Sequence, residues 1–116
     1  MPTVFLYADQ LTRPPLAAWL EGDPGRPAWT RGSLWRGARP QRVLVADTGA
    51  ERVVGVLLDL DVDRTRVLDL LLGGPGVRRL PVPSAIGLRP VRAEAWALPD
   101  ARTARNEGYR PVRSPS

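Results

Sequence analysis

The chain contains no cysteine, no histidine and no lysine. These absences exclude disulfides, Ser–His–Asp and Cys–His nucleophiles, Schiff-base chemistry, and zinc sites built from thiolate or imidazole ligands. They also exclude the phosphate-binding loop that depends on a lysine. Any catalysis must therefore use carboxylates, hydroxyls, arginine side chains or backbone amides, and we expect neither a metal site nor a cofactor.

Long apolar runs are missing as well. Residues 53–58 form one of the longer runs, which has the length of a β-strand and falls short of the roughly 18 residues that a membrane helix needs. Residues 1–7 contain no basic segment and no cleavage pattern, so they do not resemble a signal peptide. These features predict a cytoplasmic protein without a membrane partner.

The charge is positive and is carried by arginine alone. The 17 basic residues are all arginines and stand against 12 acidic residues, which gives a net charge of +5. Arginines interleaved with Trp29 and Trp35 would suit a surface that binds phosphates and stacks on bases. However, no basic block exceeds two adjacent residues and no nucleic-acid-binding motif occurs. We therefore favour a solvated surface with some affinity for anions and do not expect nucleic acid as a partner.

The length and composition predict one domain. With 116 residues, 43% of them hydrophobic and 25% charged, the chain can bury a single core. We place this domain at residues 1–111 and expect a flexible tail at 112–116. Trp19, Trp35 and Trp96 are expected in the core or in the wall of a cavity.

Hydrophobic periodicity predicts an α+β fold, a small barrel or curled sheet of six or seven short strands with two short helices. We expect strands at residues 4–7, 32–35, 42–46, 52–60, 78–84 and 91–98, and helices at 12–20 and from the N-cap Asp61 or Asp63 to Leu72. Glycines and prolines predict a loop at 21–31. An Asp-x-Gly turn at 47–49 predicts a hairpin between the strands on either side of it.

Several motifs, in this order along residues 4–111, resemble those of the gamma-glutamylcyclotransferase-like family. Tyr7-Ala8-Asp9-Gln10-Leu11 stands where members of the family have Tyr-Gly-Ser-Leu or Tyr-Gly-Ser-Asn-Leu. Leu68-Asp69-Leu70-Leu71-Leu72-Gly73 is similar to the helix motif Leu-Asp-x-x-Glu-Gly. Weaker similarities lie at residues 32–35, 39–40, 53–58, 77–79, 95–98 and 108–111. The resemblance implies the small barrel of that family.

The resemblance also implies a chemistry. In the family, the α-amine of a gamma-glutamyl amide attacks the substrate's own side-chain carbonyl and releases 5-oxoproline. The turn after the first strand would hold the substrate through backbone amides, and the helix glutamate would accept and return the proton. Here that glutamate is replaced by Leu72, and loss of a general base typically lowers the rate by about 10²–10⁴.

Two further departures lie in the turn. Ala8 replaces a glycine, which is tolerable only if residue 8 keeps a negative φ. Asp9 replaces a small hydroxyl residue, and its carboxylate would repel the substrate carboxylate that the turn receives in the family. Two interpretations of Asp9 are open: a substitute base or cation-binding group, or a plain turn residue.

The other candidate site residues have structural interpretations that we favour. Asp69 lies one helical turn from Leu72 and is expected to be structural or exposed to solvent, and Glu94 is a weaker candidate on a strand edge. Arg79 matches a family arginine and would either face an anionic ligand or, as we favour, form a salt bridge. Tyr7 is expected in the core.

Two functions fit the sequence. The favoured one is a non-catalytic family member that binds a small-molecule ligand, or a protein partner such as a second copy, in the family cavity. The alternative is a repurposed amide-cleaving or ring-forming enzyme that acts on a small amine-bearing metabolite with Asp9 as its proton carrier.

Overall fold

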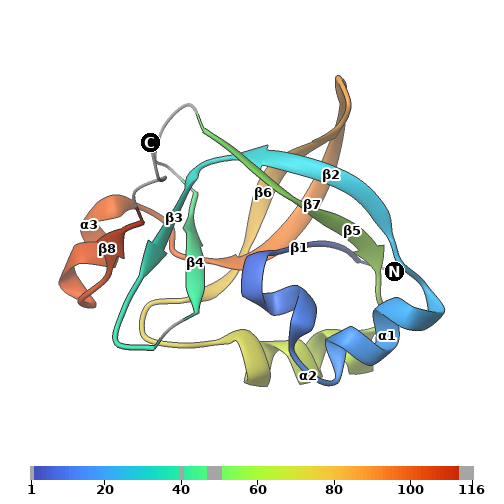
Figure 1. The fold of residues 1–116 in the computed structure, drawn as a ribbon, viewed down its shortest axis with the longest axis horizontal. Helices are drawn as coiled ribbons and strands as arrows, with labels where there is room; N and C mark the ends of the chain where they lie inside the picture. The colour runs from blue at the N-terminus through green and yellow to red at the C-terminus, as the bar shows by residue number, and fades with distance from the viewer. Residues whose placement is uncertain (1, 40, 47–50, 113–116) are drawn as a thin grey trace.

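In the computed structural model, which describes residues 2–39, 41–46 and 51–112, the chain forms eight strands, three α-helices and one short 3-10 helix (Figure 1). In chain order they are β1 (Thr3–Tyr7), η1 (Ala8–Thr12), α1 (Leu16–Gly22), β2 (Arg26–Arg31), β3 (Ser33–Arg36), β4 (Arg42–Val45), β5 (Arg52–Asp59), α2 (Val62–Leu72), β6 (Arg78–Ile86), β7 (Arg89–Ala97), α3 (Ala101–Asn106) and β8 (Arg110–Pro111). None of these helices is long and apolar enough to span a bilayer.

Five of the strands form a closed barrel in the order β1-β5-β2-β6-β7. The barrel closes where β1 runs parallel to β7, with Val4 opposite Glu94, and its other pairs are antiparallel. The interior holds the stacked rings of Phe5 and Tyr7, whose centroids lie 5.9 Å apart. Small alanines on β7 provide the space that these rings fill, as the narrow interior of a small barrel requires.

The two longer helices cover the outside of the barrel. α1 and α2 lie together on one side of it, where Leu16 and Leu68 pack against the outward side chains of β1 and β5 (Figure 1). Asp61 caps α2, because its side chain accepts a hydrogen bond from the amide of Arg64 at 2.7 Å. Trp96 of β7 fastens the helix to the barrel by donating from its indole nitrogen to Asp69 at 2.9 Å.

A second sheet, in the order β4-β3-β8, packs against α3 through a third cluster that includes Trp35 and Leu98. This sheet is joined to the barrel at Leu98, whose amide donates to the carbonyl oxygen of Leu44 at 2.9 Å. The carbonyl oxygen of Leu98 accepts from the amide of Ala46 at 3.0 Å. β4 is thus the strand that connects the two sheets.

The predicted α+β fold with a small barrel is confirmed, whereas the expected strand and helix numbers are too low. The predicted loop at 21–31 is wrong, because residues 26–31 form β2. Ala28 and Thr30 of β2 point inward, an alternation that Pro24, Gly25 and Pro27 obscure in the sequence. β2 pairs with β6 only at residues 29 and 30, so Pro27 lies where one side of the strand has no partner.

The predicted hairpin between residues 42–46 and 52–60 is also wrong. β4 pairs with β3, and β5 pairs with β1 and β2, so long-range contacts determine the partners of both strands. The expected turn at 47–49 lies outside the described residues, as do 113–116 of the expected tail. The helix predicted at 12–20 begins only at Leu16, after the 3-10 helix and two prolines. α3 and β8 were not predicted.

Candidate functional site

The turn after β1 begins at Tyr7, which is fully buried. Its hydroxyl donates a hydrogen bond to the carbonyl oxygen of Trp96 at 2.7 Å and accepts one from the amide of Leu44 at 2.8 Å. Burial raises the pKa of the Tyr7 phenol, so it stays neutral and can both donate and accept. Tyr7 therefore lies in the core and lines neither of the cavities described below.

Ala8, the next residue, has φ of 50°. The condition under which an alanine was judged tolerable here, a negative φ, is therefore not met. The left-handed region costs an L-residue other than glycine roughly 1–2 kcal/mol, and the surrounding turn holds Ala8 there. Its partly buried methyl group packs against the barrel core. The turn thus keeps the backbone shape that a glycine would adopt without strain.

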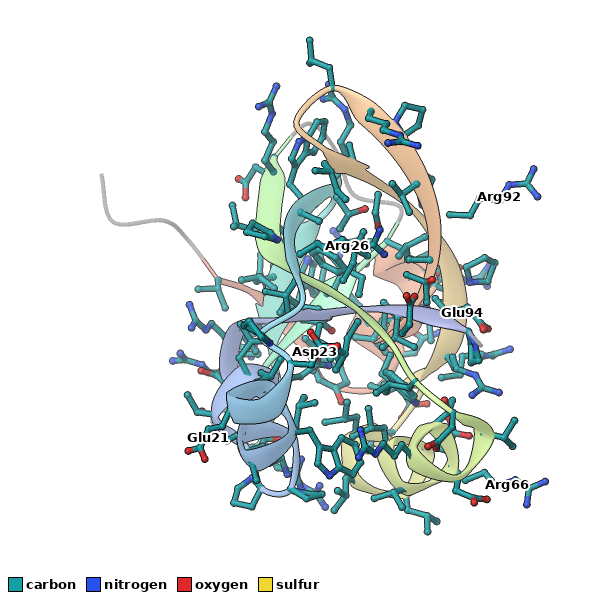
Figure 2. The ribbon with its side chains drawn as sticks, turned by 90° about the vertical axis from the view of Figure 1, so that its right-hand side faces the viewer. Glu21, Asp23, Arg26, Arg66, Arg92 and Glu94 are labelled. Carbon is teal, nitrogen blue, oxygen red and sulfur yellow. The ribbon has the colours of Figure 1, made fainter. Side chains whose placement is uncertain are left out.

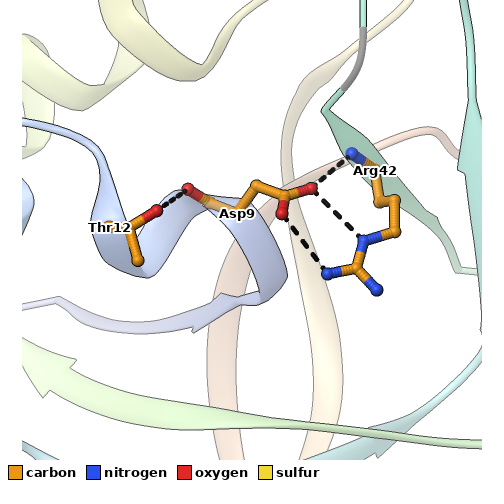
Figure 3. A network of polar contacts seen from close by, with 3 residues as sticks. All are labelled: Asp9, Thr12 and Arg42. Atoms are coloured by element: carbon orange, nitrogen blue, oxygen red, sulfur yellow. Dashed lines mark hydrogen bonds and ion pairs between the residues drawn. The ribbon is translucent and has the colours of Figure 1, made fainter.

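Asp9 is engaged by Arg42, the first residue of β4 (Figure 3). Its carboxylate accepts from the Arg42 amide at 2.9 Å and from the guanidinium Nε and Nη2 at 3.3 Å each. Thr12 donates to the main-chain oxygen of Asp9 at 3.2 Å. The hydrogen bonds from Arg42 hold the pKa of the Asp9 carboxyl below its usual value. Asp9 is therefore a weak base, and Arg42 offsets the charge that we expected to repel a substrate carboxylate.

Two adjoining cavities lie beside this turn. The first, the η1 cavity, has a volume of about 30 Å³ and is lined by Gln10, Arg13, Gln41, Arg42, Val43, Leu72 and Trp96. The second, the α2–α3 cavity, has a volume of about 150 Å³. Residues 37–39, 41 and 43 line it from the β3–β4 side, 72–75 and 77 from the end of α2, and Glu107 and Tyr109 from the segment after α3.

Leu72 connects the two cavities, since it lines both together with Gln41 and Val43. From the turn of residues 7–11, it is Gln10 that shares a cavity with Leu72. Leu11 instead packs against the hydrophobic cluster under α1 and α2. An isobutyl group thus stands at the position where the family resemblance places a proton carrier.

Tyr109 forms one wall of the α2–α3 cavity. A Cβ atom added to Gly37 would lie 3.0 Å from the Tyr109 ring, and one added to Gly74 would lie 3.7 Å from its hydroxyl oxygen. The ring therefore spans from the β3–β4 connection to the segment after α2. Burial raises the pKa of Tyr109, while Arg39 lowers it and Glu107 raises it, so both charged groups act on the phenol.

Arg79 lies elsewhere and forms the salt bridge that we favoured. Its guanidinium is 3.6 Å from Asp69 and 3.6 Å from Glu94, on the outside of the barrel. These three residues line a separate surface depression beside the start of α2, where Glu94 lies above that helix (Figure 2). Asp69 also accepts the bond from Trp96, which supports its structural interpretation.

The sequence did not identify three polar or charged residues of the α2–α3 cavity as site residues, namely Arg39, Glu107 and Tyr109. Tyr109 had a signal, because it lies in one of the family-like motifs, at residues 108–111. Arg39 lies in another of these motifs, at residues 39–40, which gave its charge no role, and Glu107 had no signal, since it is a charged residue in a connecting segment. Over residues 2–39, 41–46 and 51–112, no group of acidic side chains could hold a metal ion. Comparison with models of protein families, with curated proteins and with solved structures finds no match to this chain.

Proposed function

We propose that the chain is a divergent relative of the gamma-glutamylcyclotransferase-like proteins that binds a small molecule in the α2–α3 cavity and does not cleave gamma-glutamyl amides. The observation that carries this proposal is the position of Leu72, which lines both cavities with an apolar side chain. The family relationship is supported by the small barrel and by the glycine-like conformation of Ala8 in the turn after β1.

The carboxylates near the two cavities are poorly suited to carry a proton. Among the described residues that line the two cavities, the one carboxylate belongs to Glu107, which borders the α2–α3 cavity and not the η1 cavity. Asp9 lines neither cavity and is paired with Arg42, which lowers its pKa. A general base works best when its pKa lies near the working pH. The alternative enzyme that uses Asp9 is therefore less well supported than a binding function.

The α2–α3 cavity suits the apolar part of a small ligand. Its volume of about 150 Å³ matches that of a cavity that can hold a molecule the size of benzene. Val43, Leu72 and Val77 supply apolar walls, and Gln41 and Tyr109 supply polar groups. Apolar walls with a few polar groups are typical of ligand sites.

Binding can be tested by titrating the full chain with isoamyl alcohol, a neutral aliphatic probe, and following the amide resonances of Gly37 and Gly73 by NMR. We expect saturable shifts in the wild type. The substitution Gly74→Leu should abolish them, because a side chain there projects toward the Tyr109 hydroxyl. Gly22→Leu is the matched control, since a side chain at Gly22 meets open space, and it should bind as the wild type does.

The absence of the family's chemistry needs a separate assay. Wild-type protein incubated with gamma-glutamyl dipeptides should form no 5-oxoproline above the buffer control, measured by mass spectrometry. Turnover above background would overturn the non-catalytic part of the proposal. Equal binding of the neutral probe by Gly74→Leu and the wild type would overturn the assignment of the cavity.

A further inference from the structure

We infer that the α2–α3 cavity recognises a small zwitterion, with Arg39 as the partner of its anionic group and Glu107 as the partner of its cationic group. This inference rests on the proposed binding function and names the chemical class of the ligand. It starts from the two opposite charges that the β3–β4 connection and the segment after α3 bring to one cavity.

Both charged groups are free to meet a ligand. In the part of the chain that the structure describes, four ion pairs occur, and none of them includes Arg39 or Glu107. The two side chains therefore line the same cavity without pairing with each other. Both nevertheless act on the Tyr109 phenol, which places them around the wall that this ring forms. The cavity thus presents one unpaired charge of each sign.

Two further donors line the same cavity and can support an anionic group. Gln41 lines the cavity, and its side-chain oxygen is already used, because it accepts a hydrogen bond from Arg13 at 3.2 Å. Its amide nitrogen therefore retains hydrogens for an acceptor on the ligand. Tyr109 adds a hydroxyl for which the described residues provide no hydrogen-bond partner.

A ligand with a single charge satisfies this arrangement less well than a zwitterion. An anion would pair with Arg39 and lie near the Glu107 carboxylate, and a cation would lie near Arg39, so each would meet one repulsive group. A zwitterion with an aliphatic body offers a partner to both charges and covers Val43, Leu72 and Val77 with its apolar part.

The test uses four probes that share a branched aliphatic body and differ in charge. They are leucine, 4-methylpentanoate, isoamylamine and isoamyl alcohol, titrated into the full chain with the glycine amides of the cavity as NMR reporters. We expect leucine to bind about threefold to tenfold more tightly than either singly charged probe, the range expected of partly exposed charge-assisted contacts.

The variants assign each charge to its partner. Arg39→Gln should weaken leucine and 4-methylpentanoate by about threefold to tenfold and leave isoamylamine no weaker, while Glu107→Gln should weaken leucine and isoamylamine. Arg92→Gln is the control, since Arg92 points away from the body of the protein (Figure 2). Equal affinity for all four probes would overturn the inference and leave the binding function standing. Failure of every probe to bind would overturn both.

Discussion

The Tyr7 hydroxyl ties the barrel to the second sheet. It donates to the carbonyl oxygen of Trp96 on β7 at 2.7 Å and accepts from the amide of Leu44 on β4 at 2.8 Å. The substitution Tyr7→Phe removes this oxygen and leaves the ring in place against Phe5. It therefore isolates two hydrogen bonds from the packing of the barrel interior.

The expected loss of stability follows from the groups left behind. The carbonyl of Trp96 and the amide of Leu44 belong to fully buried residues, so water cannot replace the hydroxyl without a rearrangement of the core. Each unpaired buried group costs about 1–3 kcal/mol, and removal of the phenol's own desolvation recovers part of it. We expect Tyr7→Phe to lower the free energy of unfolding by about 2–4 kcal/mol, a large share of the roughly 5–15 kcal/mol of a typical domain.

Urea unfolding followed by tryptophan fluorescence measures this change, since Trp35 and Trp96 are buried and report on the two sheets. Tyr109→Phe is the matched control, because Tyr109 is only partly buried and its hydroxyl makes no hydrogen bond to the described residues. The control should lower the free energy of unfolding by less than about 0.5 kcal/mol. Equal effects of the two substitutions would refute the view that the Tyr7 hydroxyl joins the sheets.

Two further predictions concern the barrel and the turn. A side chain at Gly55 would overlap the main-chain oxygen of Leu6, so Gly55→Ala should lower the free energy of unfolding by about 3 kcal/mol or more. The control Gly22→Ala, at the end of α1, should raise the free energy of unfolding by up to about 1 kcal/mol. If urea unfolding showed the same loss of stability for Gly55→Ala and Gly22→Ala, this would contradict the close approach of β1 and β5. For Asp9, whose pKa is lowered by Arg42 in the folded state, the wild type should be more stable than Asp9→Asn above the pKa of unfolded aspartate, about 3.9, and should lose this advantage as the pH falls through the folded pKa. The stability difference between wild type and Asp9→Asn should stay below about 1 kcal/mol, because the side chains of Asp9 and Arg42 are both more than a third exposed. A stability difference that does not change between about pH 7 and pH 2 would contradict the pairing of Asp9 with Arg42.

The elements that sequence could predict are those with a local signal. Alternating side chains identified β6 and β7, and the two cap candidates Asp61 and Asp63 indicated the start of α2, which Asp61 caps. α3 has the same kind of signal, because Asp100 accepts from the amide of Thr103 at 2.7 Å, but this cap was overlooked. β2 could not be predicted from its local sequence, because its residues form a strand by pairing with β5 in spite of the surrounding prolines and glycine.

Of the candidate site, too, only part could be predicted from the sequence. The family resemblance implied that residues 7–11 and Leu72 face one cavity, and among these turn residues the structure places Gln10 there while Tyr7 and Leu11 pack in the core. The partner of Asp9 is a residue 33 positions away that no local pattern indicates. A negative φ was required of Ala8 because an isolated alanine prefers one, and the surrounding turn overrides that preference. Arg39 and Glu107 meet at one cavity only because β3, β8 and the end of α2 come together in the fold.

The replacement at position 72 and the pairing at position 9 favour the same kind of site. A carboxylate at position 72 would border the η1 cavity together with Arg13 and Arg42, and a neighbouring guanidinium lowers the pKa of a carboxyl group. Leucine at position 72 removes both that carboxylate and the proton transfer that the family resemblance implies for it. Arg42 pairs with Asp9, and Gln41 and Leu72 line both cavities. On the proposed function, Leu72 lacks the proton carrier and the pairing with Arg42 lowers the pKa of Asp9, so both positions favour ligand binding over proton transfer.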